Sequence, residues 1–429
     1  MAEPSPRDDE AFDFMNFLAE RGQHDFKRER WNAYGQVTHI SSWKAPFSAR
    51  YTNLNGSSNS LSTESEHSFT ATATLYAGVA LWHGAELYWV PEVISLRALS
   101  ELKGLGGAVQ NFELQKSGSM APTPYNSRLY LRQTIALGGS PVEKTSDPLQ
   151  LSHVTSSRRL VFTVGKFSVL DLFDKNAYSG DLRRQFFNMA FLAHSAFDFA
   201  ADARGYAWGG AIEYIHDDWA IRFARVTPPK HPNQLEIDYR LHRYFGDQME
   251  LELNHHWFGR PGAIRLLGYR NREVMGRFED ALTEYARDNR HNAASCASFN
   301  YGSSNAVAPD LCWARRPNVK VGVGISLEQS VTRDLGLFFR GMYADGKTEV
   351  YSYVSSDRSL SFGAVTRGTP WRRAGDLLGV GCAVSWLSRS HADYLRAGGI
   401  DGFIGDGYLT LGTERVLELF YSLNLYGPT

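Results

Sequence analysis

Residues 319–331 alternate apolar and polar side chains, and this alternation constrains the fold more than any other feature of the chain. Lys320, Ser326 and Glu328 share one set of alternate positions with two glycines. From residue 319 to residue 327 the other set is apolar: Val319, Val321, Val323, Ile325 and Leu327. Because successive side chains of a β-strand point to opposite faces, the segment predicts a strand with one face in apolar surroundings and the other in water. Those apolar surroundings are either a protein core or lipid.

Similar patterns recur along the chain and predict about fifteen strands in total. The other expected strands cover residues 32–40, 68–80, 86–94, 128–134, 159–167, 206–216, 219–226, 235–245, 248–258, 262–271, 335–344, 358–367, 377–387 and 415–426. Helices are expected only at 11–21, 274–287 and 388–397. A sheet of this size with so few helices to cover it points to an all-β, antiparallel architecture.

Short and long connections alternate between the predicted strands. The tight ones are 216–219, 244–248, 258–262 and 332–335, and the long ones are 41–67, 95–127, 168–205, 272–317 and 388–413. An antiparallel barrel with short turns at one rim and long loops at the other produces this rhythm. No linker or repeat divides the chain, so we expect a polar N-terminal segment with a short helix, 1–30, followed by one β-barrel domain, 31–429.

The composition narrows the class of protein without deciding it. Lys and Arg number 45 against 46 Asp and Glu, which argues against binding nucleic acid. Aromatic residues reach 13% although the mean hydropathy is negative. Abundant aromatics in a polar chain suit barrel strands with one wet face, and also a soluble sugar-binding β-protein. No run of apolar residues is long enough for a transmembrane helix.

Charged residues in the middle of predicted strands favour lipid over a core as the apolar surroundings. The polar faces carry Arg128 and Arg132, Glu86 and Glu92, Lys320 and Glu328, and burying them in a soluble core would be very costly. In a barrel they would line a wet lumen while the opposite faces meet lipid. A sandwich with these faces in solvent stays open as the alternative.

Cysteine and histidine positions are compatible with an exported protein without a metal or other cofactor. Cys296 and Cys312 bracket a polar loop and could form a disulfide in an oxidising compartment, or remain two free thiols. His255 and His256 are adjacent on a strand, point to opposite faces and cannot bind one metal together. Residues 1–10 do not form a signal peptide.

An ordered set of short blocks resembles the carbohydrate-selective porin (OprB-type) family. The blocks are Leu81-Trp-His-Gly-Ala-Glu-Leu-Tyr88 with Pro91-Glu92, Arg128-Leu-Tyr-Leu-Arg-Gln133, Thr163-Val-Gly-Lys-Phe167, Asp171-Leu-Phe-Asp-Lys-Asn-Ala-Tyr178, Ala196-Phe-Asp-Phe-Ala-Ala-Asp-Ala-Arg-Gly-Tyr206, Arg265-Leu-Leu-Gly-Tyr-Arg-Asn271, Met275-Gly-Arg-Phe-Glu-Asp-Ala281, Asp357-Arg-Ser-Leu-Ser361 and Glu418-Leu-Phe-Tyr-Ser-Leu423. The resemblance implies a bacterial outer-membrane β-barrel of sixteen antiparallel strands that passes small sugars without chemistry. Relative to that pattern, the chain is expected to lack its final strands and a leader.

The connection 168–205 is the best candidate for a loop folded into the lumen. Its polar candidates for the sugar passage are Asp171, Asp174, Asn176, Asp198 and Asp202. Arg128 and Arg132 on the opposite wall would donate hydrogen bonds to sugar hydroxyls. The alternative is that the loop acids pair with wall arginines and hold the loop in place, and both roles can coexist.

Aromatic and acidic residues complete the predicted site. Trp82 and Trp208 are candidates for stacking against sugars, with the interfacial aromatic girdle as their alternative. Glu86 and Glu92 face the lumen if the predicted register is right. The expected partners are small neutral, glucose-like sugars and outer-membrane lipid, with no nucleic acid, and the sequence leaves open whether barrels form homo-oligomers.

The predicted function is therefore passive, selective diffusion of small sugars, without enzymatic activity or a cofactor. A soluble secreted β-rich carbohydrate-binding protein or glycosidase is the alternative, and an outer-membrane hydrolase is a third candidate. Paired carboxylates such as Glu250 and Glu252 could mimic a glycosidase pair, but many strands of this chain carry such pairs.

Overall fold

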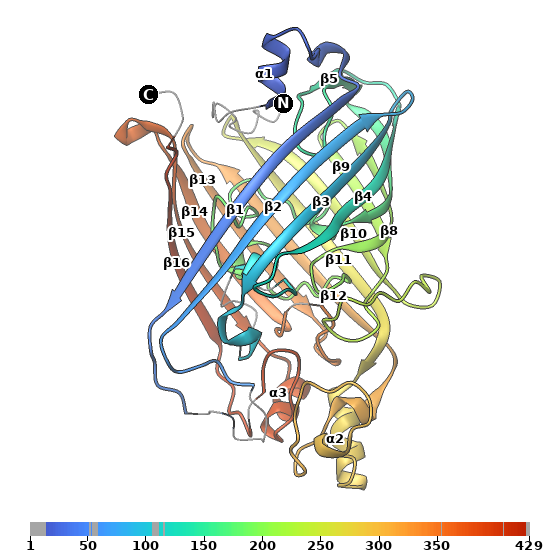
Figure 1. The fold of residues 1–429 in the computed structure, drawn as a ribbon, viewed down its shortest axis with the longest axis vertical. Coiled ribbons are helices and arrows are strands. Elements are labelled where there is room, and N and C mark those ends of the chain that lie inside the picture. The colour runs from blue at the N-terminus through green and yellow to red at the C-terminus, as the bar shows by residue number, and fades with distance from the viewer. Residues whose placement is uncertain are drawn as a thin grey trace.

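The computed structural model describes residues 14–50, 53, 59–104, 111–114, 116–352, 354–405 and 407–425. Fourteen of the strands form one antiparallel sheet that curves around the lumen of a barrel (Figure 1). The predicted all-β antiparallel fold is confirmed. Among the described residues, no helix is both long enough and apolar enough to cross a membrane.

The strands have the following bounds: β1 Trp31–Lys44, β2 Glu66–Ala80, β3 Ala85–Arg97, β4 Thr123–Ala136, β5 Pro141–Lys144, β6 His153–Ser156, β7 Arg158–Phe167, β8 Ala207–His216, β9 Trp219–Val226, β10 Phe245–Trp257, β11 Arg260–Gly276, β12 Arg315–Ser330, β13 Leu335–Ala344, β14 Arg358–Gly368, β15 Arg373–Trp386 and β16 Glu414–Ser422. The α-helices are α1 Phe14–Glu20, α2 Phe278–Arg287 and α3 Arg389–Arg396.

Strands that neighbour each other in the chain also pair in the sheet. The exception is β4, which pairs with β7, because the separate hairpin β5–β6 lies between them in sequence. At the ends of the large sheet, β1 pairs with β2 and β16 pairs with β15. No pairing joins β1 to β16 within the described residues, so the sheet is open there.

Strand β12 contains the alternation from which the sequence argument began. Its apolar residues face outward, where Val323 is 63% exposed, whereas Lys320 is only 1% exposed on the inner face. The inner-face glycines leave room for side chains packed inside the barrel. A Cβ on Gly322 would lie 2.2 Å from the Tyr269 ring, so a larger residue does not fit at that position.

Long connections gather at one end of the barrel and short ones at the other. Figure 1 shows α2 and α3, which belong to the connections 277–314 and 387–413, at the end opposite α1. Short turns join β2 to β3, β8 to β9, β10 to β11, β12 to β13 and β14 to β15. The predicted rhythm is confirmed, with the hairpin β5–β6 as an unpredicted addition at the short-turn end.

Two local predictions are wrong. Residues 235–245 alternate like a strand, but all of them except Phe245 lie in the connection 227–244, where the pairing is limited to an isolated bridge between Pro229 and Ile237. The Asp238 carboxylate accepts hydrogen bonds from the backbone and side chain of Arg240, which turns the chain. The tight turn expected at 244–248 is absent, because Phe245 begins β10.

Smaller differences concern the helices. Strand β11 continues to Gly276, so α2 begins at Phe278 instead of residue 274. Helix α1 covers Phe14–Glu20, and the start predicted at residue 11 lies outside the described residues.

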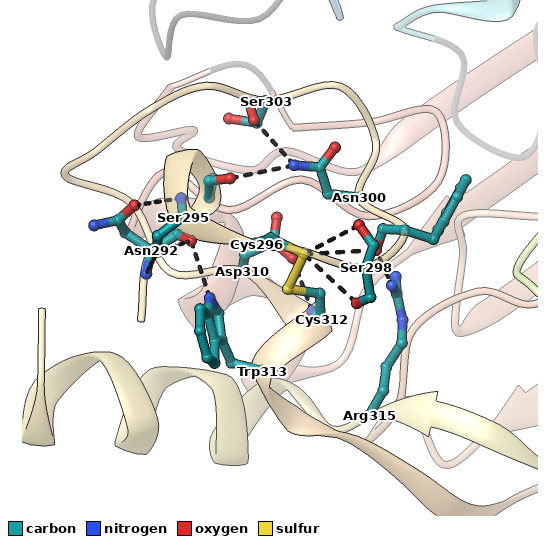
Figure 2. Close-up of a disulfide and its surroundings, with 12 residues drawn as sticks. Asn292, Ser295, Cys296, Ser298, Asn300, Ser303, Asp310, Cys312, Trp313 and Arg315 are labelled. Carbon is teal, nitrogen blue, oxygen red and sulfur yellow. Dashed lines mark hydrogen bonds between the residues drawn. A yellow bond between two sulfur atoms is a disulfide. The ribbon is translucent and has the colours of Figure 1, made fainter. Parts of the chain in front are cut away.

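The loop between β11 and β12 carries a disulfide between Cys296 and Cys312, which the sequence left as one of two alternatives (Figure 2). Next to it, the Trp313 indole donates to the backbone carbonyl of Asn292 at 3.0 Å. The Asp310 carboxylate accepts a hydrogen bond from the backbone N–H of Cys312. These contacts tie the two ends of a polar loop together.

The hydrophobic core lies inside the barrel, between the connection 168–206 and the inner wall. Phe197 and Phe199 of this connection pack near Tyr269 of β11. Phe186 and Phe191 of the same connection pack against Phe338 of β13 and, in part, against the strands that follow it. A packed core between loop and wall shows that this connection is folded into the barrel.

Candidate functional site

One ion pair fastens the infolded loop to β13. Arg340 is 1% exposed, and its Nε donates to the Asp174 carboxylate at 2.9 Å. Its remaining N–H groups donate to the backbone carbonyls of Asp174, Ser179 and Phe191 and to the Ser179 hydroxyl. The Asp174 backbone N–H donates in turn to Glu250 of β10 at 2.8 Å. Asp174 is thus an anchor of the loop and is closed off from the lumen.

Asp198 makes a second buried anchor. Its carboxylate lies 3.0 Å from Lys320 Nζ and accepts hydrogen bonds from the backbone N–H groups of Tyr351 and Ser352. Both charged side chains are almost completely buried. The prediction that Lys320 lines a water-filled passage is therefore wrong, because the loop covers it.

Further contacts bind the loop to β12 and β16. The Asn176 side chain donates to Ser326 and to the backbone carbonyl of Leu327. The backbone N–H groups of Phe187 and Asn188 donate to the Glu418 carboxylate at 2.6 and 2.9 Å. These polar contacts fasten the loop to β10–β16, whereas inner-face residues of β1, β2 and β8 such as Tyr34, Tyr76 and Glu213 stay partly exposed. The space in front of these partly exposed residues is called the open space below.

Arg128 and Asp171 meet at the border of this open space. The guanidinium of Arg128 binds the Asp171 carboxylate with two hydrogen bonds, of 2.7 and 2.6 Å. Burial alone would raise the pKa of Asp171, but the charge and hydrogen bonds of Arg128 hold it below its usual value. The guanidinium carbon also lies 5.1 Å from the ring centre of Tyr206. Both side chains stay partly exposed, so the pair holds the loop and still faces the lumen.

A second group of charges belongs to the connection between β3 and β4. Glu92 of β3 is buried and accepts hydrogen bonds from Thr74, Tyr125 and Lys116. Lys116 also lies 3.1 Å from Glu113, which pairs with Arg183 of the infolded loop at 2.8 Å. Glu92 is therefore a structural anchor, whereas Arg183 is about one-quarter exposed and reaches the open space.

The third group lies beside the hairpin β5–β6. Arg132 of β4 is 3.7 Å from Glu86 of β3, and it donates to the backbone carbonyl of Leu149 at 2.9 Å. Glu86 also lies 3.6 Å from His153 of β6. The sequence predicted both Arg132 and Glu86 on the inner wall, and the structure brings them together.

Lys175 is the cation of the infolded loop that stands apart from these pairs. It is exposed, and it makes no ion pair within the described part of the chain. The charges that act on its ammonium group include those of Glu213, Arg222, Asp171 and Arg132. Its ammonium group is therefore a hydrogen-bond donor that no ion pair of the described residues holds.

The remaining candidates lie elsewhere. Asp202 is buried and pairs with Lys166 at 3.3 Å. Trp82 lies in the turn between β2 and β3, is 61% exposed and donates to Gln133. Trp208 shares the outward face of β8 with Ile212. Neither indole joins the lumen, so stacking against a sugar inside the barrel is excluded for both in this arrangement.

Sequence reasoning missed several residues on the open wall. Tyr76 of β2 donates to Gln36 of β1 at 3.0 Å, and the charges of Arg183 and Arg128 both act on its hydroxyl. Tyr34 of β1 donates to Ser146 at 2.8 Å. The alternation along β1 and β2 could have identified the tyrosines, because they share a face with threonines. Nothing in the sequence around Arg183 identifies it as a residue of the candidate site.

Comparison with known proteins is consistent with this arrangement. The sequence model of the carbohydrate-selective porin, OprB family, matches residues 58–427. Among solved structures, the high-pH form of Pseudomonas putida OprB has a TM-score of 0.63 at 15% identity, covering 96% of this chain and 88% of its own. Pseudomonas aeruginosa OccK2 has a TM-score of 0.36 at 8% identity, covering 83% and 80%. No curated protein matches the chain in sequence.

The family match spans most of the chain, and the fold agrees with it. The chain therefore belongs to the OprB family of carbohydrate-selective porins, which makes it a passive sugar channel of the bacterial outer membrane and not an enzyme.

Proposed function

We propose that small neutral, glucose-like sugars pass through the space between the infolded loop and the inner faces of β1–β4. The observation that carries this proposal is the pairing of opposite charges along that space. Arg128–Asp171, Arg132–Glu86 and Arg183–Glu113 each join a donor to an acceptor. The wall therefore offers many hydrogen bonds while the charges of each pair largely cancel.

Such a wall suits a neutral polyol. A sugar hydroxyl can accept a hydrogen bond from a guanidinium and donate one to a carboxylate, whereas an ion must compete with the pair itself. Passage also requires weak binding at several successive sites, which partly exposed pairs provide. Outside the barrel, we propose that the apolar face of strands such as β12 contacts lipid.

The permeation of sugars of increasing size tests this proposal. Proteoliposomes containing the full chain should swell rapidly in a pentose or a hexose and slowly in a trisaccharide. Arg132→Ala should change the ratio of the swelling rates of two hexoses by about threefold to tenfold. One charged hydrogen bond is worth about 1.5–3 kcal/mol before solvent screening reduces it. Arg333→Ala, in the exposed turn between β12 and β13, is the matched control. Identical rates for all three proteins would remove Arg132 from the passage.

Lys175, which makes no ion pair within the described residues, leads to a separate prediction about ion selectivity. Lys175→Met should shift ion selectivity toward cations, because it removes a positive charge from the lumen without breaking an ion pair. The measurement is the reversal potential of single channels in planar bilayers under a KCl gradient. An unchanged reversal potential would show that Lys175 lies outside the conducting path. Lys347→Met, in the connection 345–357, is the control.

A further inference from the structure

The outward surface of β9–β11 carries a charged cluster at the end of the barrel that bears the long loops. Asp247 of β10 lies between two arginines, 2.7 Å from Arg225 of β9 and 2.6 Å from Arg270 of β11. Register places the three residues side by side. The side chain of Arg225 is about one-third exposed and that of Arg270 about one-half. Three nitrogens of the two guanidinium groups have no hydrogen-bond partner within the described structure. Two cations share one anion, so the cluster is positive.

This cluster borders the apolar belt directly. One step along the strands toward the short turns, the outward side chains are Phe223, Met249 and Val323, which are exposed. Arginine within hydrocarbon is costly, so Arg225 and Arg270 mark where the headgroups begin on their own two strands. A positive row at headgroup height favours a negatively charged lipid.

An outward groove of about 690 Å³ begins beside the cluster. Its apolar lining includes Leu266, Ile325 and Leu360, and Gly268 and Gly341 lower its floor. Gly268 is two residues from Arg270 on the same strand, and a Cβ there would meet no atom within 4 Å. The groove has room for an apolar chain immediately below the arginines.

A third arginine lies at the far side of the groove. Arg358 of β14 lines it, stacks over the Tyr343 ring at 4.7 Å, and has a buried Nε without a hydrogen-bond partner in the described structure. Register joins Gly268, Val323, Tyr343 and Arg358 in one row across β11–β14. Three strand spacings separate the ends of that row, roughly 14 Å.

We propose that this surface binds one bisphosphorylated glycolipid of the outer leaflet. One phosphate binds at Arg225 and Arg270, the second at Arg358, and an acyl chain fills the groove over Gly268. A disaccharide headgroup with a phosphate at each end is long enough to reach both places. A second copy of the chain fits less well, because a symmetric contact through this face would place like charges together.

Native mass spectrometry of the detergent-solubilised full chain tests the proposal. The probes are diphosphoryl lipid A, monophosphoryl lipid A and phosphatidylglycerol. The wild type should retain diphosphoryl lipid A best, and Arg270→Gln combined with Arg358→Gln should weaken its retention about tenfold or more. Gly268→Leu should also weaken retention by filling the groove. Gly35→Leu, at an outward position of β1 with open space, and Arg333→Gln are the controls.

Each outcome of these measurements shows whether the glycolipid, a second copy of the chain or neither binds at this surface. Equal retention by the wild type and the double variant, or no preference for the diphosphorylated lipid, would overturn the proposal. Retention unaffected by Gly268→Leu would overturn the groove as the acyl-chain site. An oligomer that Gly268→Leu dissociates while no lipid is retained would assign the face to a second copy. Sugar permeation, measured on the same variants, should not change, so failure of the sugar proposal is distinguishable from failure of this one.

Discussion

Replacing Arg340 with leucine is expected to release the infolded loop and widen the channel. Arg340 is buried and makes five hydrogen bonds to three residues of the loop. Its loss would leave the Asp174 carboxylate buried without its counter-charge, which costs about 3–5 kcal/mol. Single-channel conductance should rise, discrimination between hexoses and trisaccharides should fall, and the melting temperature in detergent should drop.

Two further variants identify the cause. Arg333→Leu removes an exposed arginine from a short turn and should leave conductance and melting unchanged. Arg340→Leu combined with Asp174→Leu removes both charges, so it should recover part of the stability while the channel stays wide. If Arg340→Leu alone conducts and discriminates like the wild type, the Arg340–Asp174 pair does not set the width of the passage.

Raising the pH from 6 to 10 is expected to loosen the long loops around α3. His391 is buried, with Nδ1 3.0 Å from Asp357 and Nε2 3.1 Å from Asp401, and it stacks on Phe278 at 4.2 Å. Burial alone would lower the pKa of His391, but the two carboxylates outweigh it and raise that pKa to about 9. Asp401 also accepts hydrogen bonds from the Val350 backbone, so the contact joins the connections 345–357 and 387–413.

The direction of this effect follows from the raised pKa. The stabilisation is complete below pH 6.5, the ordinary value for histidine, and is lost as pH rises through about 9. A shift of this size corresponds to about 3 kcal/mol. Hydrogen exchange of the two connections should therefore accelerate between pH 6 and 10, after correction for intrinsic rates. His391→Gln should exchange fast at both values, and His256→Gln should behave like the wild type. Equal protection at both pH values in the wild type would contradict the prediction.

Most of the fold could be predicted from the alternating segments of the sequence. Period-two patterning identifies inner and outer faces, because one register is strongly favoured when the two faces meet different surroundings. It failed at 235–245, where Asp238 turns the chain despite an alternating pattern. It also could not explain Gly322, since the Tyr269 ring that requires this glycine comes from another strand.

Less of the candidate site could be predicted from the sequence. The pairing of Arg128 with Asp171 was one of the alternatives that the sequence left open, and the structure shows it. The other loop acids could not be sorted, because whether Asp174 or Asp198 faces the lumen depends on which wall the loop packs against. That choice rests on partners far away in sequence, such as Arg340 and Lys320.

Many polar anchors of the infolded loop lie on β10–β16, and this has a consequence for how such a channel can diversify. Arg340, Lys320 and Glu418 are such anchors, whereas Gln36, Tyr76 and Arg132, which border the proposed passage, lie on β1–β4. We expect substitutions of this second set to alter which sugars the channel accepts with little effect on its stability. Preference for a sugar is then expected to change by single substitutions, each tolerated on its own, without an intermediate that fails to fold.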